Sequence, residues 1–262
     1  MNRITALAAT AALAASTLAL AAPTQAAPTF HAKARAYQVT ATASTDVAIA
    51  KEDKVKVRGR VTPKAAGQKV ILQQRVGNKK KWVQTGKATV KRNGRYVVKD
   101  KPTTPGSREY RVLKPGSKGI RKGVSKPLQV EVYRWEKLGY RTFAGTGFTS
   151  QGAVIGTEYY TASLATTTPG TAATAEFTLG RKCTSMRATY ALTDTSLSGS
   201  SGAVTVTADG KQLAVHSLAV GTIVADEVLD LTGVFRLKID ASTTATPAAT
   251  AAVATPEVLC TR

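Results

Sequence analysis

The densest cluster of charged side chains in the sequence is Lys79-Lys80-Lys81, which is followed directly by Trp82. Ammonium groups neutralise the negative charges of a polymer, and an indole ring can stack on a ring of the same polymer. Further basic residues lie where we expect loop tips, and we predict that they approach this cluster. The candidate polyanion-binding residues are Lys79, Lys80, Lys81, Trp82, Lys91, Arg92, Arg95, Lys118, Arg121 and Lys122.

The basic residues also have a second interpretation, as the solvated face of a sheet. From Lys54 to Val61 charged and neutral residues alternate, which predicts a strand with one wet face. Such faces keep all-β proteins from pairing edge to edge. Both interpretations stay open at this point.

The two cysteines, Cys183 and Cys260, lie far apart in the second half of the chain. In an exported protein an isolated pair most often forms one disulfide, which here would stabilise the fold by roughly 2 to 4 kcal/mol. A metal site would need more ligands, and the chain has only two histidines, His31 and His216. We therefore expect a disulfide, no metal and no cofactor.

The residues give little support for catalysis. His216 is the only candidate base for a Ser or Cys nucleophile, and it lies in an apolar alternating stretch that predicts a packed histidine. Ser150-Gln151-Gly152 lacks the flanking glycines of a nucleophile elbow, and Asp226, Glu227 and Asp230 lack a calcium-loop spacing. We expect a protein that is not an enzyme.

The first residues predict export. A basic start at Arg3, a run of Ala and Leu, and small residues up to Ala26 are typical of a signal peptide, residues 1–26, cleaved after Ala26. A membrane anchor is the competing interpretation, but Ala contributes little to insertion, and no second apolar run could anchor the mature chain. We expect a secreted protein, extracellular or associated with the cell wall, whose partner is a polysaccharide or an anionic envelope polymer such as a teichoic acid, not nucleic acid.

The distribution of charge predicts two domains. The formal net charge is +21, and the segment from His31 to Lys137 holds 28 basic and 7 acidic residues. The segment from Leu138 to Arg262 holds 8 and 9. Such a break favours a domain boundary, and we place a basic domain at 36–134 and a neutral one at 138–262.

The basic domain reads as a β-sandwich. Short alternating stretches are separated by turn residues such as Asn93-Gly94. We expect strands at Tyr37 to Ala43, Lys54 to Val61, Lys69 to Val76, Lys81 to Thr85, Ala88 to Arg92, Gly94 to Lys99, Glu109 to Leu113 and Leu128 to Tyr133. The order of Gly59-x-Val61-x-Pro63, Val70-Ile71-Leu72-Gln73, Trp82, Gly94-x-Tyr96 and Tyr110-Arg111-Val112 resembles the immunoglobulin-like sandwiches of secreted bacterial proteins. The resemblance implies that Tyr110 forms a tyrosine corner.

The neutral domain predicts a β-sandwich or jelly roll. Asp209-Gly210 between two alternating stretches is typical of a hairpin with a type I′ turn. We expect strands at Ala175 to Leu179, Thr184 to Leu192, Ala203 to Ala208, Lys211 to Val215, Glu227 to Leu231, Val234 to Ile239 and Pro256 to Cys260. Phe177 and Phe235 read as core. The Thr/Ala/Pro-rich stretches at Thr166 to Thr174 and Ala241 to Thr255 read as mobile loops or O-glycosylation sites.

The segment from Gly156 to Cys260 resembles the NPCBM family, a jelly-roll module first proposed as carbohydrate-binding. The matching stretches are Tyr159-Tyr160-Thr161, Glu176 to Gly180, Met186 to Asp194, Val204 to Lys211, Val228 to Leu237 and Pro256 to Cys260. The resemblance implies glycan binding, although this half of the chain lacks Trp. The candidate glycan-binding residues are Tyr159 and Tyr160, because adjacent strand residues face opposite ways and one must point outward.

Together these patterns favour a secreted, non-catalytic protein that binds carbohydrate or an envelope polymer, with a basic domain that adheres to anionic polymers. The alternative is a structural or protein-interaction module without sugar specificity. A hydrolase or inhibitor with an unfamiliar site is a third hypothesis. The sequence alone indicates neither the ligand nor the oligomeric state.

Overall fold

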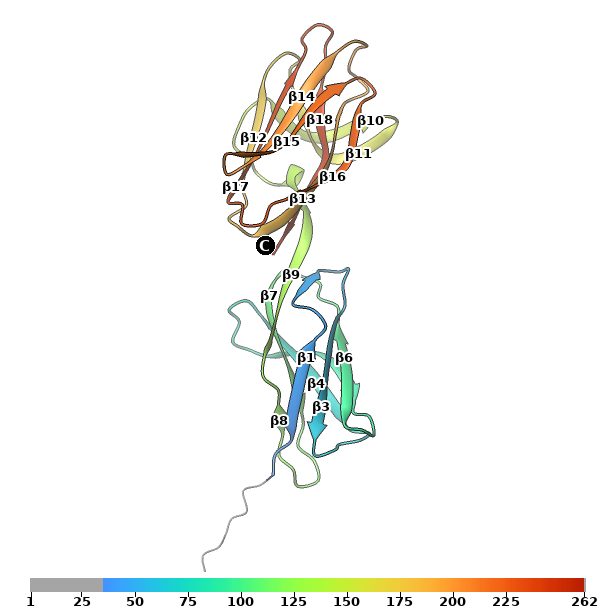
Figure 1. Cartoon of the computed structure of the whole chain (residues 1–262), viewed down its shortest axis with the longest axis vertical. Coiled ribbons are helices and arrows are strands. Elements are labelled where there is room, and N and C mark those ends of the chain that lie inside the picture. The colour runs from blue at the N-terminus through green and yellow to red at the C-terminus, as the bar shows by residue number, and fades with distance from the viewer. Residues whose placement is uncertain (1–34, 262) are drawn as a thin grey trace, which may run out of the picture. The chain divides into compact units, whose positions relative to one another are not determined.

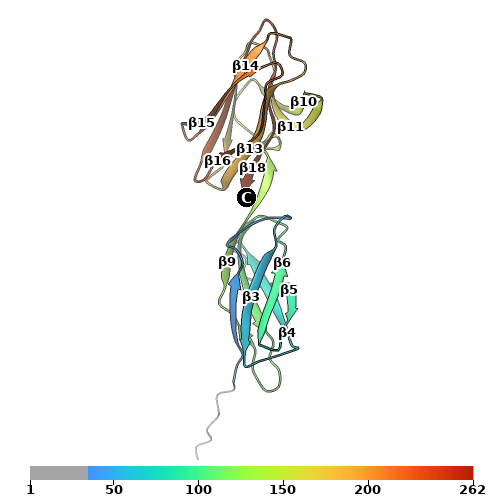
Figure 2. The ribbon, with the colours of Figure 1, turned by 45° about the vertical axis from the view of Figure 1, so that its right-hand side comes forward.

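The computed structural model describes residues 35–261, which form an all-β protein (Figures 1 and 2). The expected fold class, strands packed as β-sandwiches, is confirmed. Buried side chains form two large hydrophobic clusters, one from Tyr37 to Val132 and one from Leu138 to Cys260. We name the strands around the first cluster the N-terminal sandwich and those around the second the C-terminal sandwich. The boundaries of the predicted domains, and the two family resemblances, stay predictions.

The N-terminal sandwich packs a three-stranded sheet, in the order β1-β3-β6, against strands in the order β5-β4-β7-β9. The short strand β2 lies parallel to β9, and β8 pairs with β7. The bounds are β1 Gln38–Ala43, β2 Val47–Ile49, β3 Val55–Thr62, β4 Lys69–Val76, β5 Val83–Thr89, β6 Arg95–Asp100, β7 Gly106–Lys114, β8 Gly123–Val124 and β9 Leu128–Lys137.

The C-terminal sandwich packs strands in the order β10-β11-β18-β13-β16 against a four-stranded sheet in the order β12-β17-β14-β15. A short 3-10 helix, η1 at Leu138–Tyr140, precedes them. The bounds are β10 Phe148–Ile155, β11 Glu158–Thr166, β12 Ala173–Thr178, β13 Cys183–Leu192, β14 Ser201–Ala208, β15 Lys211–Ala219, β16 Ile223–Asp230, β17 Arg236–Thr243 and β18 Ala251–Cys260.

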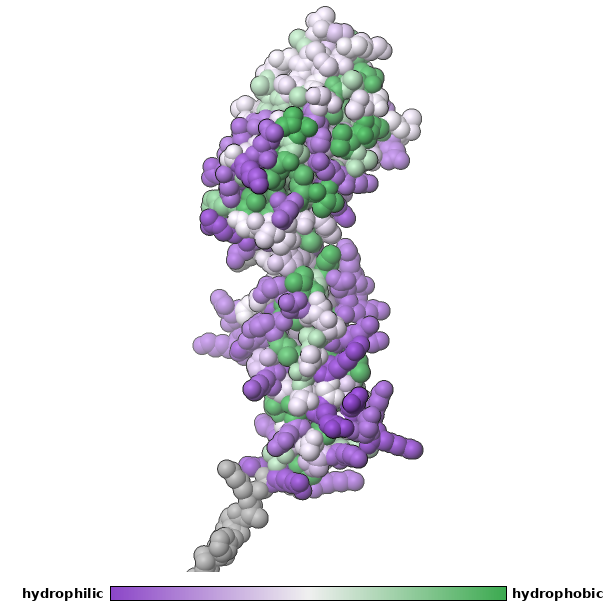
Figure 3. Space-filling view, viewed as in Figure 1, coloured by the Kyte–Doolittle hydropathy of each residue, from purple (hydrophilic) through white to green (hydrophobic). Residues whose placement is uncertain are grey.

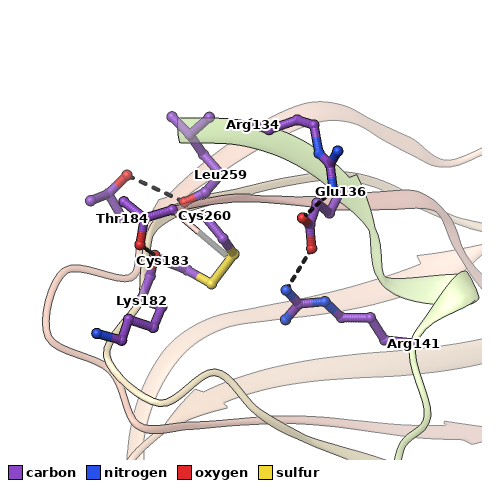
Figure 4. The surroundings of a disulfide bond; sticks show 9 residues. Arg134, Glu136, Arg141, Lys182, Cys183, Thr184, Leu259 and Cys260 are labelled. Atoms are coloured by element: carbon purple, nitrogen blue, oxygen red, sulfur yellow. Dashed lines mark hydrogen bonds and ion pairs between the residues drawn. A yellow bond between two sulfur atoms is a disulfide. The ribbon is translucent and has the colours of Figure 1, made fainter. Parts of the chain in front are cut away.

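Strand β9 hydrogen-bonds in both sandwiches. Its first half pairs with β7, and its last residues, from Arg134 to Lys137, pair with β18. This pairing joins one sheet of each sandwich into a single hydrogen-bonded sheet of 11 strands. The predicted disulfide lies at this join, between the directly opposite residues Cys183 and Cys260 of β13 and β18 (Figure 4).

Glu136 of β9 lies beside the disulfide and accepts hydrogen bonds from two arginines (Figure 4). Arg134 Nη2 is 2.8 Å from one carboxylate oxygen, and Arg141 Nη2 is 2.7 Å from the other. Burial raises the pKa of Glu136, but the two hydrogen bonds outweigh this effect and hold the pKa below its ordinary value.

Several strand predictions were wrong in extent. The stretches Lys81 to Thr85 and Ala88 to Arg92 form one strand, β5, which continues through Gly86. Strand β10 was missed, and β11 was foreseen only at Tyr159 and Tyr160, because Gly152 and small polar residues interrupt the alternation there. The stretch from Ala241 to Thr255 is mostly strand, not a mobile loop: β17 runs to Thr243, and β18 begins at Ala251 with fully buried Ala side chains. Thr166 likewise ends β11 and is buried.

Two side chains differ from their predicted roles. The Tyr110 hydroxyl donates to the Asp100 carboxylate at 2.6 Å, not to a backbone carbonyl as in a tyrosine corner. Phe235 was predicted to be core, but it is 40% exposed and lies just before β17, under the guanidinium of Arg181. Phe177 is buried, as predicted. The Asp209-Gly210 turn is confirmed, since both residues have positive φ as a type I′ turn requires.

The predicted signal peptide, 1–26, and His31 lie outside the described residues. Within residues 35–261 no helix has the length and apolar character needed to cross a membrane.

Replacing Glu136 with Gln should lower the free energy of unfolding by about 1 kcal/mol near neutral pH, because two charge-assisted hydrogen bonds weaken in a partly screened site. The folded pKa of Glu136 lies below the ordinary value of 4.5. The stabilisation is therefore present above that pH and is lost as the pH falls through the folded pKa. Melting temperatures of the parent protein and E136Q, measured from neutral to acid pH, should converge on acidification. A gap that stays constant across this range would contradict the role of the charge.

Candidate anion-binding face

The outer face of sheet β1-β3-β6 gathers basic side chains from two strands. Alternation places the valines of β3, together with Tyr96 and Val98 of β6, in the core and turns the charged residues between them to solvent. We call this surface the basic face, formed by Lys56, Arg58, Arg60, Arg95 and Lys99. Hydrophilic side chains project along the N-terminal sandwich, including the side on which β6 lies (Figure 3).

The register of β3 and β6 sets like charges directly opposite each other. Lys56 pairs with Lys99, and Arg60 pairs with Arg95, while Arg58 lies opposite Val97. Like charges at directly opposite positions destabilise a sheet. No carboxylate points outward from β1, β3 or β6 in the described part of the chain, because Asp100 faces the core. The face therefore carries a repulsion that its own residues do not relieve.

A hollow of about 790 Å³ lies over this face. Thr40 and Thr42 of β1 line one side, and Lys91 and Asn93 reach it from the β5–β6 turn. That turn is the predicted Asn93-Gly94 turn, with Gly94 at a φ of +79°. The hollow thus combines six cations with hydroxyl and amide groups, which suits a ligand with several negative charges.

The backbone under the basic face is held by a hydrogen bond that crosses β3. The buried Tyr96 side chain of β6 passes beneath Gly59, and its hydroxyl donates to the Thr40 carbonyl of β1 at 2.5 Å. A Cβ atom at Gly59 would lie only 1.8 Å from that carbonyl oxygen and 2.5 Å from the hydroxyl. Burial raises the pKa of Tyr96, so the hydroxyl stays a donor. Glycine is therefore required between Arg58 and Arg60.

The structure divides the predicted polyanion-binding residues into two groups. Lys91, Arg92 and Arg95 lie at the end of the sandwich where β1 begins, as do Lys118, Arg121 and Lys122, whose loop bridges to Ala36. Lys79, Lys80, Lys81 and Trp82 lie at the tip of the β4–β5 hairpin. The seven residues of β5 separate this tip from the β5–β6 turn, a distance of roughly 20 Å. The predicted proximity of the two groups was wrong, because the hairpin turns its tip away.

Trp82 already stacks with arginines of its own sandwich. The guanidinium of Arg111 lies 4.1 Å from the ring centroid, and that of Arg75 lies 5.0 Å from it. Such cation–π contacts occupy the surface that a base or sugar would need. The Trp82 ring therefore packs against arginines of its own sheet and is not open for a base or sugar to stack on it.

The hollow beside Lys79 and Lys80 also contains a carboxylate. It measures about 440 Å³ and includes Glu109, which is paired with Arg75 and accepts a hydrogen bond from Gln129. The hydrogen bond from Arg75 holds the pKa of Glu109 below its ordinary value, so this carboxylate is charged and repels an anion. Of the two hollows, the one over the basic face is the better anion site.

The predicted candidates did not include four residues that line the hollow over the basic face, Lys56, Arg58, Arg60 and Lys99. Their signal was present in the alternation from Lys54 to Val61, which we read as a solvated strand face. What the alternation does not contain is the register between β3 and β6, which brings cations from distant parts of the chain opposite each other.

A third hollow lies on the sheet β10-β11-β18-β13-β16, and Tyr160 lines it. It measures about 270 Å³ and includes Arg187, Asp226 and Glu257. Arg187 pairs with Glu257 at 2.6 Å and stacks on Trp135 of β9 at 4.2 Å. The Asp226 carboxylate makes no hydrogen bond or ion pair within residues 35–261. We call this surface the Tyr160 groove.

The neighbouring Tyr159 is 68% exposed and lies outside the Tyr160 groove. As expected for adjacent strand residues, the two rings point to opposite sides: Tyr160 packs against buried alanines of the sheet, whereas the Tyr159 ring lies over Gly152 of β10. Asp226 has a φ of +49° and Thr255 a φ of +37°, so two walls of the groove have a strained backbone.

His216 faces the interior of the C-terminal sandwich. Its Nε2 is 2.9 Å from the Glu227 carboxylate, and its ring lies 4.5 Å from that of Tyr190. The contact links the edge strands β15 and β16. No cluster of three or more potential metal-ligating side chains occurs among the residues with a described position.

Removing a cation from the basic face should stabilise the protein. Arg95→Thr and Lys99→Thr each relieve one like-charge pair, so the free energy of unfolding should rise by up to about 1 kcal/mol, and more at low salt. Lys87→Thr is the matched control, because Lys87 of β5 lies opposite Ile71. Urea unfolding at two salt concentrations measures the effect. Equal changes in all three variants would show that the repulsion is negligible.

No protein-family model matches this chain, and no curated protein is significantly similar to it.

Proposed function

We propose that this chain is a non-catalytic binding protein that works outside the cell and adheres to an anionic polymer through the basic face. The observation that carries the proposal is the pairing of Lys56 with Lys99 and of Arg60 with Arg95 on a face without carboxylates. A sheet that served only as a scaffold would gain stability from mixed charges at these positions. The leader-like start of the sequence supports a partner in the cell envelope.

The proposal predicts adhesion to purified cell walls that depends on both salt and the basic face. The triple variant K56Q/R60Q/R95Q should bind at least about tenfold more weakly than the parent protein in a sedimentation assay, since three charge contacts are lost. Raising the salt to about 1 M should release the parent protein, because the Debye length falls to about 3 Å.

The variant K79Q/K80Q/K81Q is the matched control, because it removes the same charge from the tip of the β4–β5 hairpin, outside the hollow over the basic face. It should retain most of the adhesion. Equal losses in the two triple variants would show that net charge alone is responsible. Adhesion that ignores salt would overturn the electrostatic mechanism altogether.

A second candidate function, carbohydrate binding by the C-terminal sandwich, is favoured by the Tyr160 groove. An aromatic ring beside a carboxylate without a partner is the combination that contacts a sugar through its apolar face and its hydroxyls. Tyr160 and Asp226 provide this pair. The groove is small, so we propose a single sugar unit of a polysaccharide as its occupant.

Calorimetric titration of the full chain with soluble oligosaccharides tests this second function. Asp226→Asn and Tyr160→Ala should each lower the affinity by about tenfold, the effect of one lost charged hydrogen bond or stacking contact. Tyr159→Ala is the control and should leave binding unchanged. If no saccharide binds the parent protein, the sandwich is better explained as a structural or protein-interaction module.

A further inference from the structure

We infer that the polymer held by the basic face is a polyol phosphate, with six covalent bonds between successive phosphorus atoms, lying along β3. The inference rests on the proposed adhesion to anionic polymers and specifies its ligand. It follows from the spacing of the cations along the strand and across it.

Along β3, Lys56, Arg58 and Arg60 point to the same side at every second residue. Two residues of an extended chain contain six backbone bonds and span about 7 Å. The side chains therefore form a row of cations that repeats every six bonds.

A phosphodiester chain with three carbon atoms between its phosphates has the same repeat. The path P–O–C–C–C–O–P contains six single bonds, so the extended chain advances by about 7 Å per phosphate, as two strand residues do. Successive phosphates can then meet successive cations without falling out of step. Inorganic polyphosphate, with two bonds between phosphorus atoms, cannot match this row one to one.

The neighbouring strands define a footprint of three phosphates. At one end Lys56 and Lys99 face one phosphate, and at the other Arg60 and Arg95 face another. Arg58 alone faces the middle phosphate, because Val97 lies opposite it and can contact the carbon units. The hydroxyls of Thr40 and Thr42 flank the row on the side of β1.

The chemistry of the face favours a polyol chain over a nucleic acid, although both have the six-bond repeat. Sequence-tolerant binding of single strands depends on aromatic side chains on which bases stack. The outward residues of β1, β3 and β6 include none, since Tyr96 is buried. The bases of a nucleic acid would gain nothing here.

Binding of the full chain to synthetic glycerol phosphate oligomers tests the inference. Affinity should rise with each added phosphate up to three and then level off, with a slope of log affinity against log salt of about −2. Arg58→Gln should lower the affinity for the trimer about tenfold, the cost of a lost charge-assisted contact. Lys87→Gln, which removes one charge from β5 outside the hollow, should change it less than about threefold.

The comparison ligands separate the possible failures. For inorganic polyphosphate, Arg58→Gln should cost less affinity than it does for the trimer, because that polymer has no fixed register. An equal cost for the two polymers would overturn the register while leaving adhesion to polyanions intact. If thymidine oligomers bind about tenfold more tightly than glycerol phosphate of equal length, a nucleic acid is the ligand and the polyol is excluded. If none of these polymers binds, the proposed function itself fails.

Discussion

The hydrogen bond from the Tyr96 hydroxyl to the Thr40 carbonyl is the contact on which the basic face depends. It ties β6 to β1 across β3, and it is possible only because residue 59 lacks a side chain. The three strands are thereby held in register although their outward cations repel. The valines beneath them, Val57 and Val98 among others, are fully or almost fully buried and provide the apolar burial that offsets the repulsion.

Strands and turns could be predicted from the sequence where neighbouring residues determine them, through the alternation of apolar and polar residues and through turn residues. Strand β4 matches its prediction at both ends, and the Asp209-Gly210 hairpin and the disulfide are confirmed. The strand predictions failed where small residues are buried. Ala251 to Ala254 looked like a mobile segment because Ala carries little apolar area, yet two sides of β18 are covered, by the sandwich core and by the β10–β11 hairpin. A strand that is buried on both faces lacks the alternation of apolar and polar residues on which the prediction relied.

The candidate site was predictable in kind but not in place. Composition locates an excess of cations in the first half of the chain, whereas register decides which of them act together. Arg95 was a predicted site residue, but its partner Arg60 lies 35 residues earlier in the chain and joins it only through the β3–β6 ladder. Conversely, Lys79 to Lys81 are contiguous in sequence, yet the carboxylate of Glu109 lies in the hollow beside Lys79 and Lys80.

Comparison of the two sandwiches separates stabilising charges from charges available for binding. On β17 of the C-terminal sandwich, Arg236 pairs with Glu176 and Lys238 pairs with Asp240. These outward cations alternate along a strand as those of β3 do, but each has an acidic partner. A sheet surface therefore has room for carboxylates at such positions, and exposure alone does not account for their absence on the basic face. A carboxylate on the basic face would relieve the repulsion between the opposed cations, but it would also weaken the proposed hold of the face on an anion.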